Sequence, residues 1–234
     1  MLRSPRQIQR MFGSIAHRYD FLNHLLSLSI DRYWRWLTTR RLASALDKES
    51  LVLDLCTGTG DLAFSLSKRS RVIGCDFSHE MLVIGRRKAQ EKALAGRVRF
   101  VEGDALQLPF ESGSFRAVTI AFGLRNLAGY SEGLEEMFRI LQPAGLLAVL
   151  EFSQPRIPIL RQLYFFYFTR ILPWIGERIS GREGPYAYLP ESVKEFPSPP
   201  ELDQLILHAG FRSVQHERLS GGIATLHLAE KADR

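Results

Sequence analysis

The sequence predicts an α/β protein built on a doubly wound, mostly parallel sheet of seven strands. From residue 51 onward, short apolar runs alternate with segments of helical periodicity, which is typical of parallel strands joined by helices. Two β-rich runs, 211–218 and 223–230, then follow each other around Ser220-Gly221-Gly222 and predict a C-terminal antiparallel hairpin. We therefore expect a parallel sheet with antiparallel strands added at its C-terminal end.

Residues 51–61, with the sequence LVLDLCTGTGD, form the central motif of the chain. The run 51–55 is apolar except for Asp54, so we expect a buried strand with an acid near its carboxyl end. Gly58 and Gly60 then allow the backbone to approach a ligand closely, and a helix is expected over 62–68. Open α/β sheets bind their ligands at such a junction.

Two classes of ligand fit this glycine-rich loop. The spacing of Gly58, Gly60 and Ala63 satisfies the dinucleotide pattern G-x-G-x-x-G/A, in which a helix N-terminus holds a pyrophosphate. However, Asp54 and Asp61 flank the loop, and their charges repel a pyrophosphate. The same carboxylates suit the ammonium and sulfonium groups of S-adenosylmethionine. The sequence therefore favours this methyl donor over a dinucleotide.

The next two strands also end in acids. The strand 71–76 ends in Asp76, where a carboxylate can accept both hydroxyls of a ribose, as it does in both ligand classes. The strand 98–101 leads to Asp104 and Ala105, which we expect beside the adenine amino group, although an aspartate after a strand is also a common turn residue. Both positions support an adenosine ligand.

The remaining elements follow in the order of a doubly wound sheet. A fourth strand over 115–121 precedes the fragment Ala121-Phe122-Gly123-Leu124-Arg125-Asn126, a helix over 131–141 and a fifth strand over 146–152. Ser198-Pro-Pro-Glu201 predicts a capping box and a helix that stops at Gly210.

The chain is predicted to have two parts, an N-terminal helical cap (1–47) and a ligand-binding domain (48–234) that includes a long aromatic insertion (153–197). The cap is expected either to pack against the sheet edge or to cover the ligand site and touch an anionic bilayer, with Trp34 and Trp36 as anchors. The insertion suits a lid for a flat, apolar substrate, or else an extra core helix.

Composition restricts the class of protein. The chain has 234 residues, 45% of them hydrophobic, and contains no apolar run of 18 residues and no export signal, so we expect a cytoplasmic protein that touches the inner face of the membrane peripherally. Its net charge of +6 suits an anionic surface, but no RNA-binding signature accompanies it, and no nucleic-acid partner is expected. Cys56 and Cys75 are expected to be reduced core residues, and no metal is expected. Homodimerisation remains open.

Several motifs along the chain resemble those of the ubiquinone/menaquinone biosynthesis C-methyltransferases (UbiE/MenG type), within the Rossmann-like class I methyltransferases that use S-adenosylmethionine. The glycine-rich loop is shared by the whole superfamily, whereas FGLRN and YLPES are specific to this family. The motifs that carry the resemblance are Val52-Leu53-Asp54, Gly58-Thr59-Gly60-Asp61, Asp76, Asp104-Ala105-Leu106, Leu108-Pro109-Phe110, Phe122 to Asn126, Glu151-Phe152-Ser153, Tyr188 to Ser192, Met11-Phe12 and Tyr19 to Asn23.

The resemblance implies contacts between the donor and Thr59, Asp76, Asp104 and Ala105. Where some members have a donor-contacting serine, this chain has Ala121, so that only backbone contact is expected there. Cys56 stands where many methyltransferases have glycine and is expected to be structural.

The resemblance also implies a prenylated quinol as the substrate and methylation of its ring carbon. Loss of a hydroxyl proton makes the ring nucleophilic, and Arg125 is the expected stabiliser of the phenolate, with Asn126 holding substrate or donor. His17, His24 and Tyr188 are candidate proton acceptors, and Tyr188, Phe122 and Tyr19 are expected on the substrate side. A methyltransferase with another small-molecule or lipid acceptor, and a donor-binding protein without turnover, are the alternatives.

Overall fold

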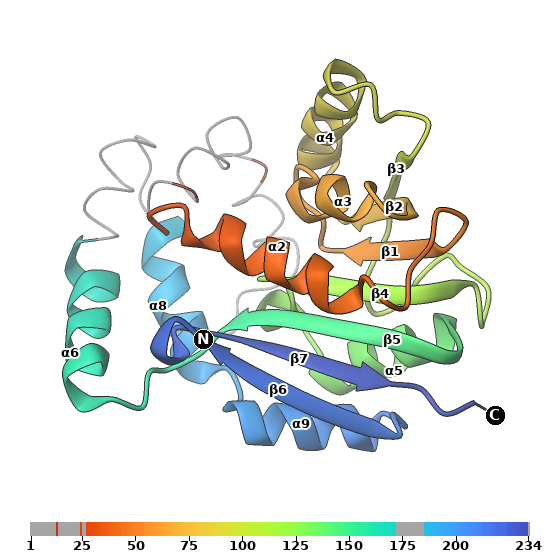
Figure 1. The fold of residues 1–234 in the computed structure, drawn as a ribbon. Helices are drawn as coiled ribbons and strands as arrows, with labels where there is room; N and C mark the ends of the chain where they lie inside the picture. Colours follow the sequence, from red (N-terminus) through yellow and green to blue (C-terminus); the bar gives the residue numbers. More distant parts are fainter. Residues whose placement is uncertain (1–12, 14–23, 25–26, 172–184, 234) are drawn as a thin grey trace.

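The computed structural model describes Gly13, His24 and residues 27–171 and 185–233. Its centre is a seven-stranded sheet with the strand order β3-β2-β1-β4-β5-β7-β6 (Figure 1). The strands are β1 (Leu51–Leu55), β2 (Arg71–Asp76), β3 (Val98–Glu102), β4 (Phe115–Ala121), β5 (Leu141–Phe152), β6 (Ser213–Leu219) and β7 (Ala224–Glu230).

The first five strands pair in parallel, whereas β7 pairs antiparallel with both β5 and β6. The predicted mostly parallel sheet with a C-terminal hairpin is therefore confirmed. β5 begins at Leu141 rather than at the predicted residue 146, because the Pro143/Gly145 stretch bulges within the strand instead of ending it: the β4–β5 register shifts at this point.

Helices cover both faces of the sheet. The described helices before the insertion are α2 (Ile30–Leu42), α3 (Asp61–Leu66), α4 (His79–Glu91), the 3₁₀ turn η1 (Leu124–Asn126) and α5 (Tyr130–Ile140). Those after β5 are α6 (Pro158–Phe166), the π-helical η2 (Tyr167–Ile171), α8 (Pro185–Glu195), α9 (Pro199–His208) and the 3₁₀ turn η3 (Ser220–Gly222).

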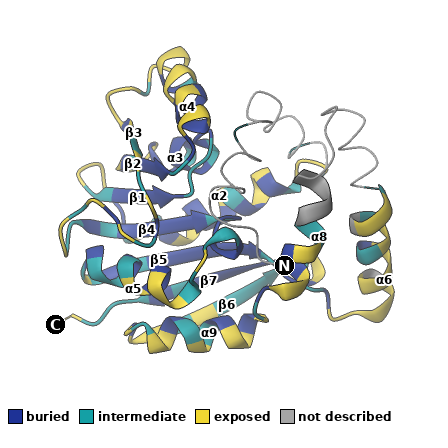
Figure 2. Cartoon of the chain, turned by 180° about the vertical axis from the view of Figure 1, so that it is seen from behind, coloured by how far each residue is buried: buried dark blue, intermediate teal, exposed yellow. Residues whose placement is uncertain are grey.

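The helices form two hydrophobic layers, one on each face. One layer joins α2, α3 and α4 to the sheet, and the other joins α5 and α9 to the opposite face. Figure 2 shows the buried strands between helices whose outer sides are exposed. The predicted capping box of α9 is present, formed by Ser198 and Glu201. Ser78 also caps α4, because its side chain accepts a hydrogen bond from the backbone of Met81.

The N-terminal segment differs from the prediction in one respect. α2 lies across a face of the sheet, not against its edge, and Trp34 is only 2% exposed, with its indole N–H donating to Ser220 at 3.0 Å. Trp34 is therefore a core residue and not a membrane anchor. Trp36 is exposed and stacks on Tyr33. In the part of the chain that the structure describes, no helix is both long and apolar enough to cross a bilayer.

Candidate active site

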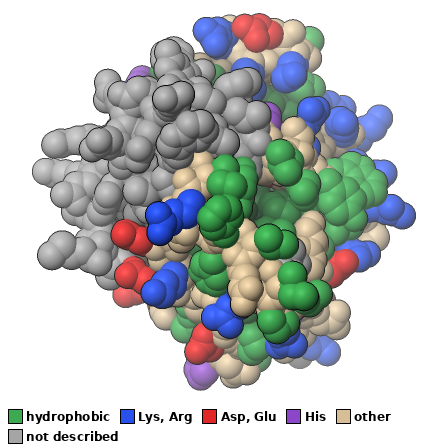
Figure 3. Space-filling view, turned by 90° about the vertical axis from the view of Figure 1, so that its left-hand side faces the viewer, with side chains coloured by type: hydrophobic (Ala, Val, Ile, Leu, Met, Phe, Trp, Pro, Cys, Tyr) green, Lys and Arg blue, Asp and Glu red, His purple; other side chains and the backbone are tan. Residues whose placement is uncertain are grey.

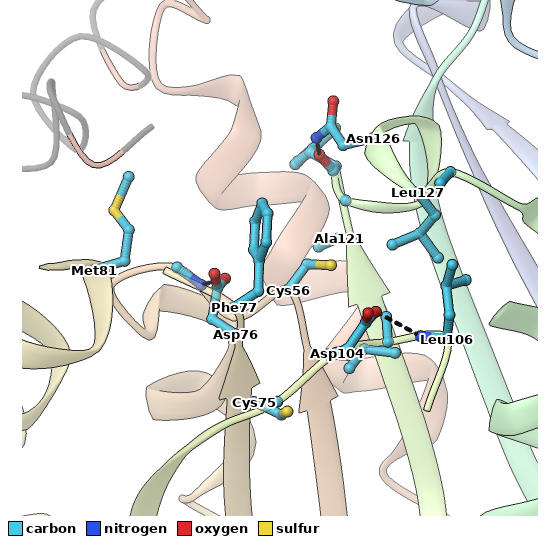
Figure 4. Close-up of a pocket in the computed structure, with 17 residues that line it drawn as sticks. Cys56, Cys75, Asp76, Phe77, Met81, Asp104, Leu106, Ala121, Asn126 and Leu127 are labelled. Carbon is cyan, nitrogen blue, oxygen red and sulfur yellow. Dashed lines mark hydrogen bonds between the residues drawn. The ribbon is translucent and has the colours of Figure 1, made fainter. Parts of the chain in front are cut away.

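A cavity of about 290 Å³ opens at the carboxyl edge of the sheet, where β1, β2, β3 and β4 end (Figure 4). Its walls come from the loop after β1, the β2 end with Asp76 and Phe77, the turn after β3 and the η1 segment. This is the position at which doubly wound sheets bind ligands. The lining residues include seven of the predicted site residues, Gly58, Asp76, Asp104, Ala105, Ala121, Phe122 and Asn126.

Asp76 lies in the wall of this cavity and also holds its shape. One carboxylate oxygen accepts the backbone N–H of Gly58 at 2.8 Å, and the other accepts that of Ser78 at 2.9 Å. Burial raises its pKa, while these N–H groups oppose the rise. Each oxygen retains a second lone pair, so Asp76 can bind a ribose hydroxyl while it fixes the glycine-rich loop.

Asp104 is a turn residue that also lines the cavity. Its Oδ1 accepts the backbone N–H of Leu106 at 2.9 Å. Ala105 beside it is buried and lines the cavity too. Figure 4 shows Asp104 on a different wall of the cavity from Asp76.

Asp54 does not line the main cavity. It is 1% exposed and accepts hydroxyl hydrogen bonds from Thr57 at 2.6 Å and from Thr119 on β4 at 2.7 Å. Burial raises its pKa to about 6, although both hydroxyls act to lower it. Asp54 therefore links the glycine-rich loop, through Thr57, to strand β4, through Thr119.

A second, smaller recess of about 30 Å³ lies beside the main cavity, with Cys56, Gly58 and Ala121 in the walls of both. It is polar, and its lining includes Arg35, Asp54, Thr59 and Asp61. Arg35 comes from α2, so the N-terminal segment does contribute to this site. The recess thus offers a guanidinium and carboxylates within one small volume.

The carboxylates at this recess are already paired. Lys88 contacts Asp61 at 2.9 Å and the Thr59 hydroxyl at 3.0 Å. Burial acts to raise the pKa of Asp61, but Lys88 and Arg35 outweigh it and lower the pKa. The repulsion of a pyrophosphate that the sequence suggests is therefore weaker than expected, because two cations face the same carboxylates.

Two residues of the loop after β1, Gly60 and Cys56, have a positive φ. Gly60 has φ +94°, and a Cβ there would lie 2.8 Å from the Phe100 ring. Cys56, where many methyltransferases have glycine, also adopts a positive φ of 51°, and burial raises the pKa of its thiol well above 9. Cys56 thus lies in the walls of both cavities. Gly60 lines neither cavity and serves the shape of the loop.

The FGLRN segment begins with a packing residue. Phe122 has φ +59°, and its ring packs against Trp34 and Phe152, with centroids 5.9 and 4.6 Å away. The next residue, Gly123, leaves no room for a side chain: a Cβ there would clash with Cys56, whose Cβ would lie 2.4 Å away. The aromatic ring of Phe122, expected on the substrate side, therefore belongs largely to the core under α2, although the residue borders the cavity.

Arg125 is buried next to the cavity and does not line it. Its Nη1 contacts Glu151 Oε1 at 2.6 Å and the Phe122 carbonyl at 2.5 Å, and its guanidinium lies over the Phe152 ring. Its Nε is buried and has no hydrogen-bond partner among the described residues. Glu151 was missed as a site residue, because only the fold brings the end of β5 against η1.

Asn126 completes the cavity on the η1 side. Its Nδ2 donates to the Phe122 carbonyl at 3.4 Å, whereas its Oδ1 is buried and has no partner in the part of the chain described. A buried acceptor without a partner is costly in a finished core. Asn126 therefore lies in the cavity wall, as Figure 4 shows, and carries an acceptor that no described residue uses.

The expected proton acceptors receive little support. Both ring nitrogens of His24 face carboxylates, with Nδ1 3.0 Å from Asp31 and Nε2 3.4 Å from Asp61. His24 thus fastens the segment before α2 to the glycine-rich loop. His17 and Tyr19 lie outside the described residues, as does the side chain of Tyr188 on α8. Arg35 was also missed as a site residue, because it is one of several arginines in this part of the chain and the sequence does not distinguish it from the others.

Comparisons with known proteins agree with this geometry. The model of the ubiE/COQ5 methyltransferase family matches residues 2–231. A protein of Thermus thermophilus named demethylmenaquinone methyltransferase is 49% identical over 225 residues, covering 94% of this chain and all of the relative. The ubiquinone/menaquinone biosynthesis C-methyltransferase UbiE of Geobacter sp. is 43% identical, with 96% of each chain covered.

Solved structures support the fold. A SAM-dependent methyltransferase from Aquifex aeolicus superimposes with a TM-score of 0.61 at 20% identity, over 82% of this chain and 88% of that one. At this identity the likeness concerns the fold alone. The seven-stranded sheet of this chain therefore has the class I methyltransferase fold.

Proposed function

This chain belongs to the ubiE/COQ5 methyltransferase family, and we propose that it methylates a ring carbon of a prenylated quinol with S-adenosylmethionine as the donor. The substrate would be demethylmenaquinol or the equivalent ubiquinone precursor. One observation carries the proposal: a cavity at the carboxyl edge, bounded by Asp76 and Asn126, occurs in a chain 49% identical to a demethylmenaquinone methyltransferase.

The two adjoining cavities suit the two ends of the donor. The larger one is mostly apolar, with Asp76 at its polar end, and fits an adenosine. The smaller one combines Arg35 with Asp54 and Asp61, and a zwitterionic amino acid needs both signs of charge. When bound, S-adenosylmethionine would supply the methyl group: the ring carbon forms a bond to it, the sulfur leaves with the electrons of the broken bond, and the ring carbon then loses its own proton to restore aromaticity.

The residues of η1 are proposed to act on the acceptor. Asn126 offers its unpartnered Oδ1 in the cavity wall to a quinol hydroxyl or to the donor. Arg125 adds a fixed positive charge one residue away, and its buried Nε–H has no partner among the described residues. A guanidinium remains protonated, so its role is to stabilise the phenolate and not to remove the proton.

The insertion is proposed to receive the prenyl tail near the membrane. Exposed apolar side chains lie on and just before α6, namely Ile157, Ile159, Leu163 and Phe166. α6 stands at the side of the molecule (Figure 1), and the face seen in Figure 3 carries hydrophobic side chains among lysine and arginine side chains. Apolar residues next to cations suit an anionic bilayer surface.

A methyl-transfer assay tests the proposal. The full chain would be incubated with methyl-labelled donor and demethylmenaquinol, and in parallel with a non-prenylated phenol, a phospholipid and a protein acceptor. Label in menaquinol alone is the expected result. Label in another acceptor and none in the quinol would overturn the substrate, and tighter calorimetric binding of NADH than of S-adenosylmethionine would overturn the donor.

A further inference from the structure

Two histidines and an aspartate meet on the sheet far from the donor cavity. His216 on β6 and His227 on β7 are paired residues of the C-terminal hairpin, and Asp203 reaches them from α9. β6 is the edge strand at the opposite end of the sheet from β3. The proposed methyl transfer does not use this cluster.

The geometry of the cluster is compact. Asp203 Oδ2 lies 2.5 Å from His216 Nδ1, and its Oδ1 lies 2.7 Å from His227 Nδ1. The three ligand atoms lie within 4.8 Å of one another, the one such group of three in the described part of the chain. His227 is 2% exposed, whereas His216 is 24% exposed, so solvent reaches one side of the cluster.

These distances are near those of a metal site. A tetrahedral zinc ion with bonds of about 2.0–2.2 Å holds its ligand atoms roughly 3.4 Å apart. One Asp203 oxygen would bind the ion, and the Nδ1 that now contacts this oxygen, at 2.5 or 2.7 Å, would move away from it by less than about 1 Å. In the metal-free protein each Nδ1–H donates to Asp203, and metal binding requires only that the proton of a neutral ring occupy Nε2.

The chemistry of the donors restricts the ion. Two imidazoles and one carboxylate suit Zn²⁺, Co²⁺ or Ni²⁺, whereas Mg²⁺ and Ca²⁺ prefer oxygen ligands alone. The two cysteines predict no metal, and the two histidines come together only through the pairing of the hairpin strands.

We propose that Asp203, His216 and His227 form a binding site for one divalent ion of the zinc class, with water as the fourth ligand. The ion would fasten α9 to the C-terminal hairpin. Because the three ligands come from three separate elements, an ion bound by all of them stabilises the folded chain over the unfolded one.

Cobalt titration of the tag-free, metal-free full chain tests this site. We expect visible absorption bands that saturate at one equivalent and a rise in the melting temperature with zinc. His216→Gln should weaken metal binding at least about tenfold, since replacing even a residue that only hydrogen-bonds to a metal ligand typically lowers the metal affinity 10–100-fold. His208→Gln is the control: it removes an exposed histidine from α9, the helix that carries Asp203, and should leave metal binding unchanged. Asp203→Asn serves as the second ligand variant, in case His216→Gln folds poorly.

The location is tested with the native chain alone. A crystal grown with zinc should show an anomalous difference peak between the three side chains. No saturable binding, binding equally tight in His216→Gln, or a peak elsewhere would each overturn the proposal. In those cases the cluster is a hydrogen-bonded link between α9 and the hairpin.

Discussion

Glu151 and Arg125 form an ion pair in which both side chains are almost fully buried, with Oε1 2.6 Å from Nη1. The other Glu151 oxygen accepts the backbone N–H of Arg125 at 3.3 Å. One carboxylate at the end of β5 thereby fixes both the backbone and the side chain of η1. The position of Asn126 in the cavity wall depends on this link.

Replacing Glu151 with Gln should reduce the free energy of unfolding by about 3–5 kcal/mol, because it leaves the buried Arg125 charge without its counterion. Urea unfolding followed by circular dichroism measures the change. As a control, Glu217→Gln breaks the exposed pair with Arg41 and should cost less than about 1 kcal/mol. If both variants lose the same free energy of unfolding, the buried ion pair contributes no more to stability than the exposed one.

Arg125→Lys keeps the charge but loses the planar guanidinium, whose Nη1 contacts both Glu151 and the Phe122 carbonyl. We expect turnover to fall by about one order of magnitude or more, with donor affinity little changed. Steady-state kinetics and calorimetry separate the two quantities. Arg139→Lys, which alters a guanidinium paired with Glu136 on α5, is the matched control. Full activity of Arg125→Lys would remove Arg125 from the chemical step.

Asn126→Ala should separate stability from function. The Asn126 Oδ1 has no partner among the described residues, so its removal should leave the free energy of unfolding unchanged or raise it by about 1 kcal/mol. Turnover should fall, because the acceptor group in the cavity wall is lost. Thermal unfolding and the methyl-transfer assay measure both effects. A less stable variant with full turnover would make Asn126 a structural residue.

The sequence was sufficient to predict the sheet, because its strands are short apolar runs between turns and helix caps. It also located Asp76, since an acid at a strand end must face the carboxyl edge of a parallel sheet. Its predictions for 1–26 concern residues of which only Gly13 and His24 are described.

Side-chain partners that are distant along the chain could not be predicted in this way. Helical periodicity places Trp34 on the apolar side of an amphipathic helix, but it does not predict which face of the sheet buries this side chain. Likewise, nothing near Asp61 indicated that Lys88 would pair with it. One missed signal was available: His216 and His227 stand in the two predicted hairpin strands at similar distances from Ser220-Gly221-Gly222, and the observed register pairs them directly.

Asp54 should make stability depend on pH in a defined window. Burial raises its pKa in the folded protein from 3.8 to about 6, so between these values the folded state holds more protons than the unfolded state. The stability linked to this group is therefore complete below about pH 4 and is lost as the pH rises through 6, by about 3 kcal/mol in all.

Asp54→Asn removes that titration while it keeps the shape of the side chain. Urea unfolding of both proteins between pH 4 and 7 should show the variant gaining stability relative to the native chain as the pH rises. Because every other group is common to the two, their difference isolates Asp54. A difference that does not change with pH would mean that Asp54 is ionised throughout.

Leu163→Ser and Phe166→Ser should impair the use of a long-tailed quinol more than that of a short-chain analogue. Both side chains are about 60% exposed on α6, so the substitutions leave the core intact, and Tyr164 between them stays buried. Removing apolar surface should raise the apparent KM for the tailed substrate severalfold, since each lost methylene contact costs about 0.8 kcal/mol. Leu207→Ser on α9 removes an exposed leucine on another element and is the control. Steady-state kinetics with both quinols at saturating donor gives the comparison, and α6 variants that treat the two substrates alike would exclude α6 from tail binding.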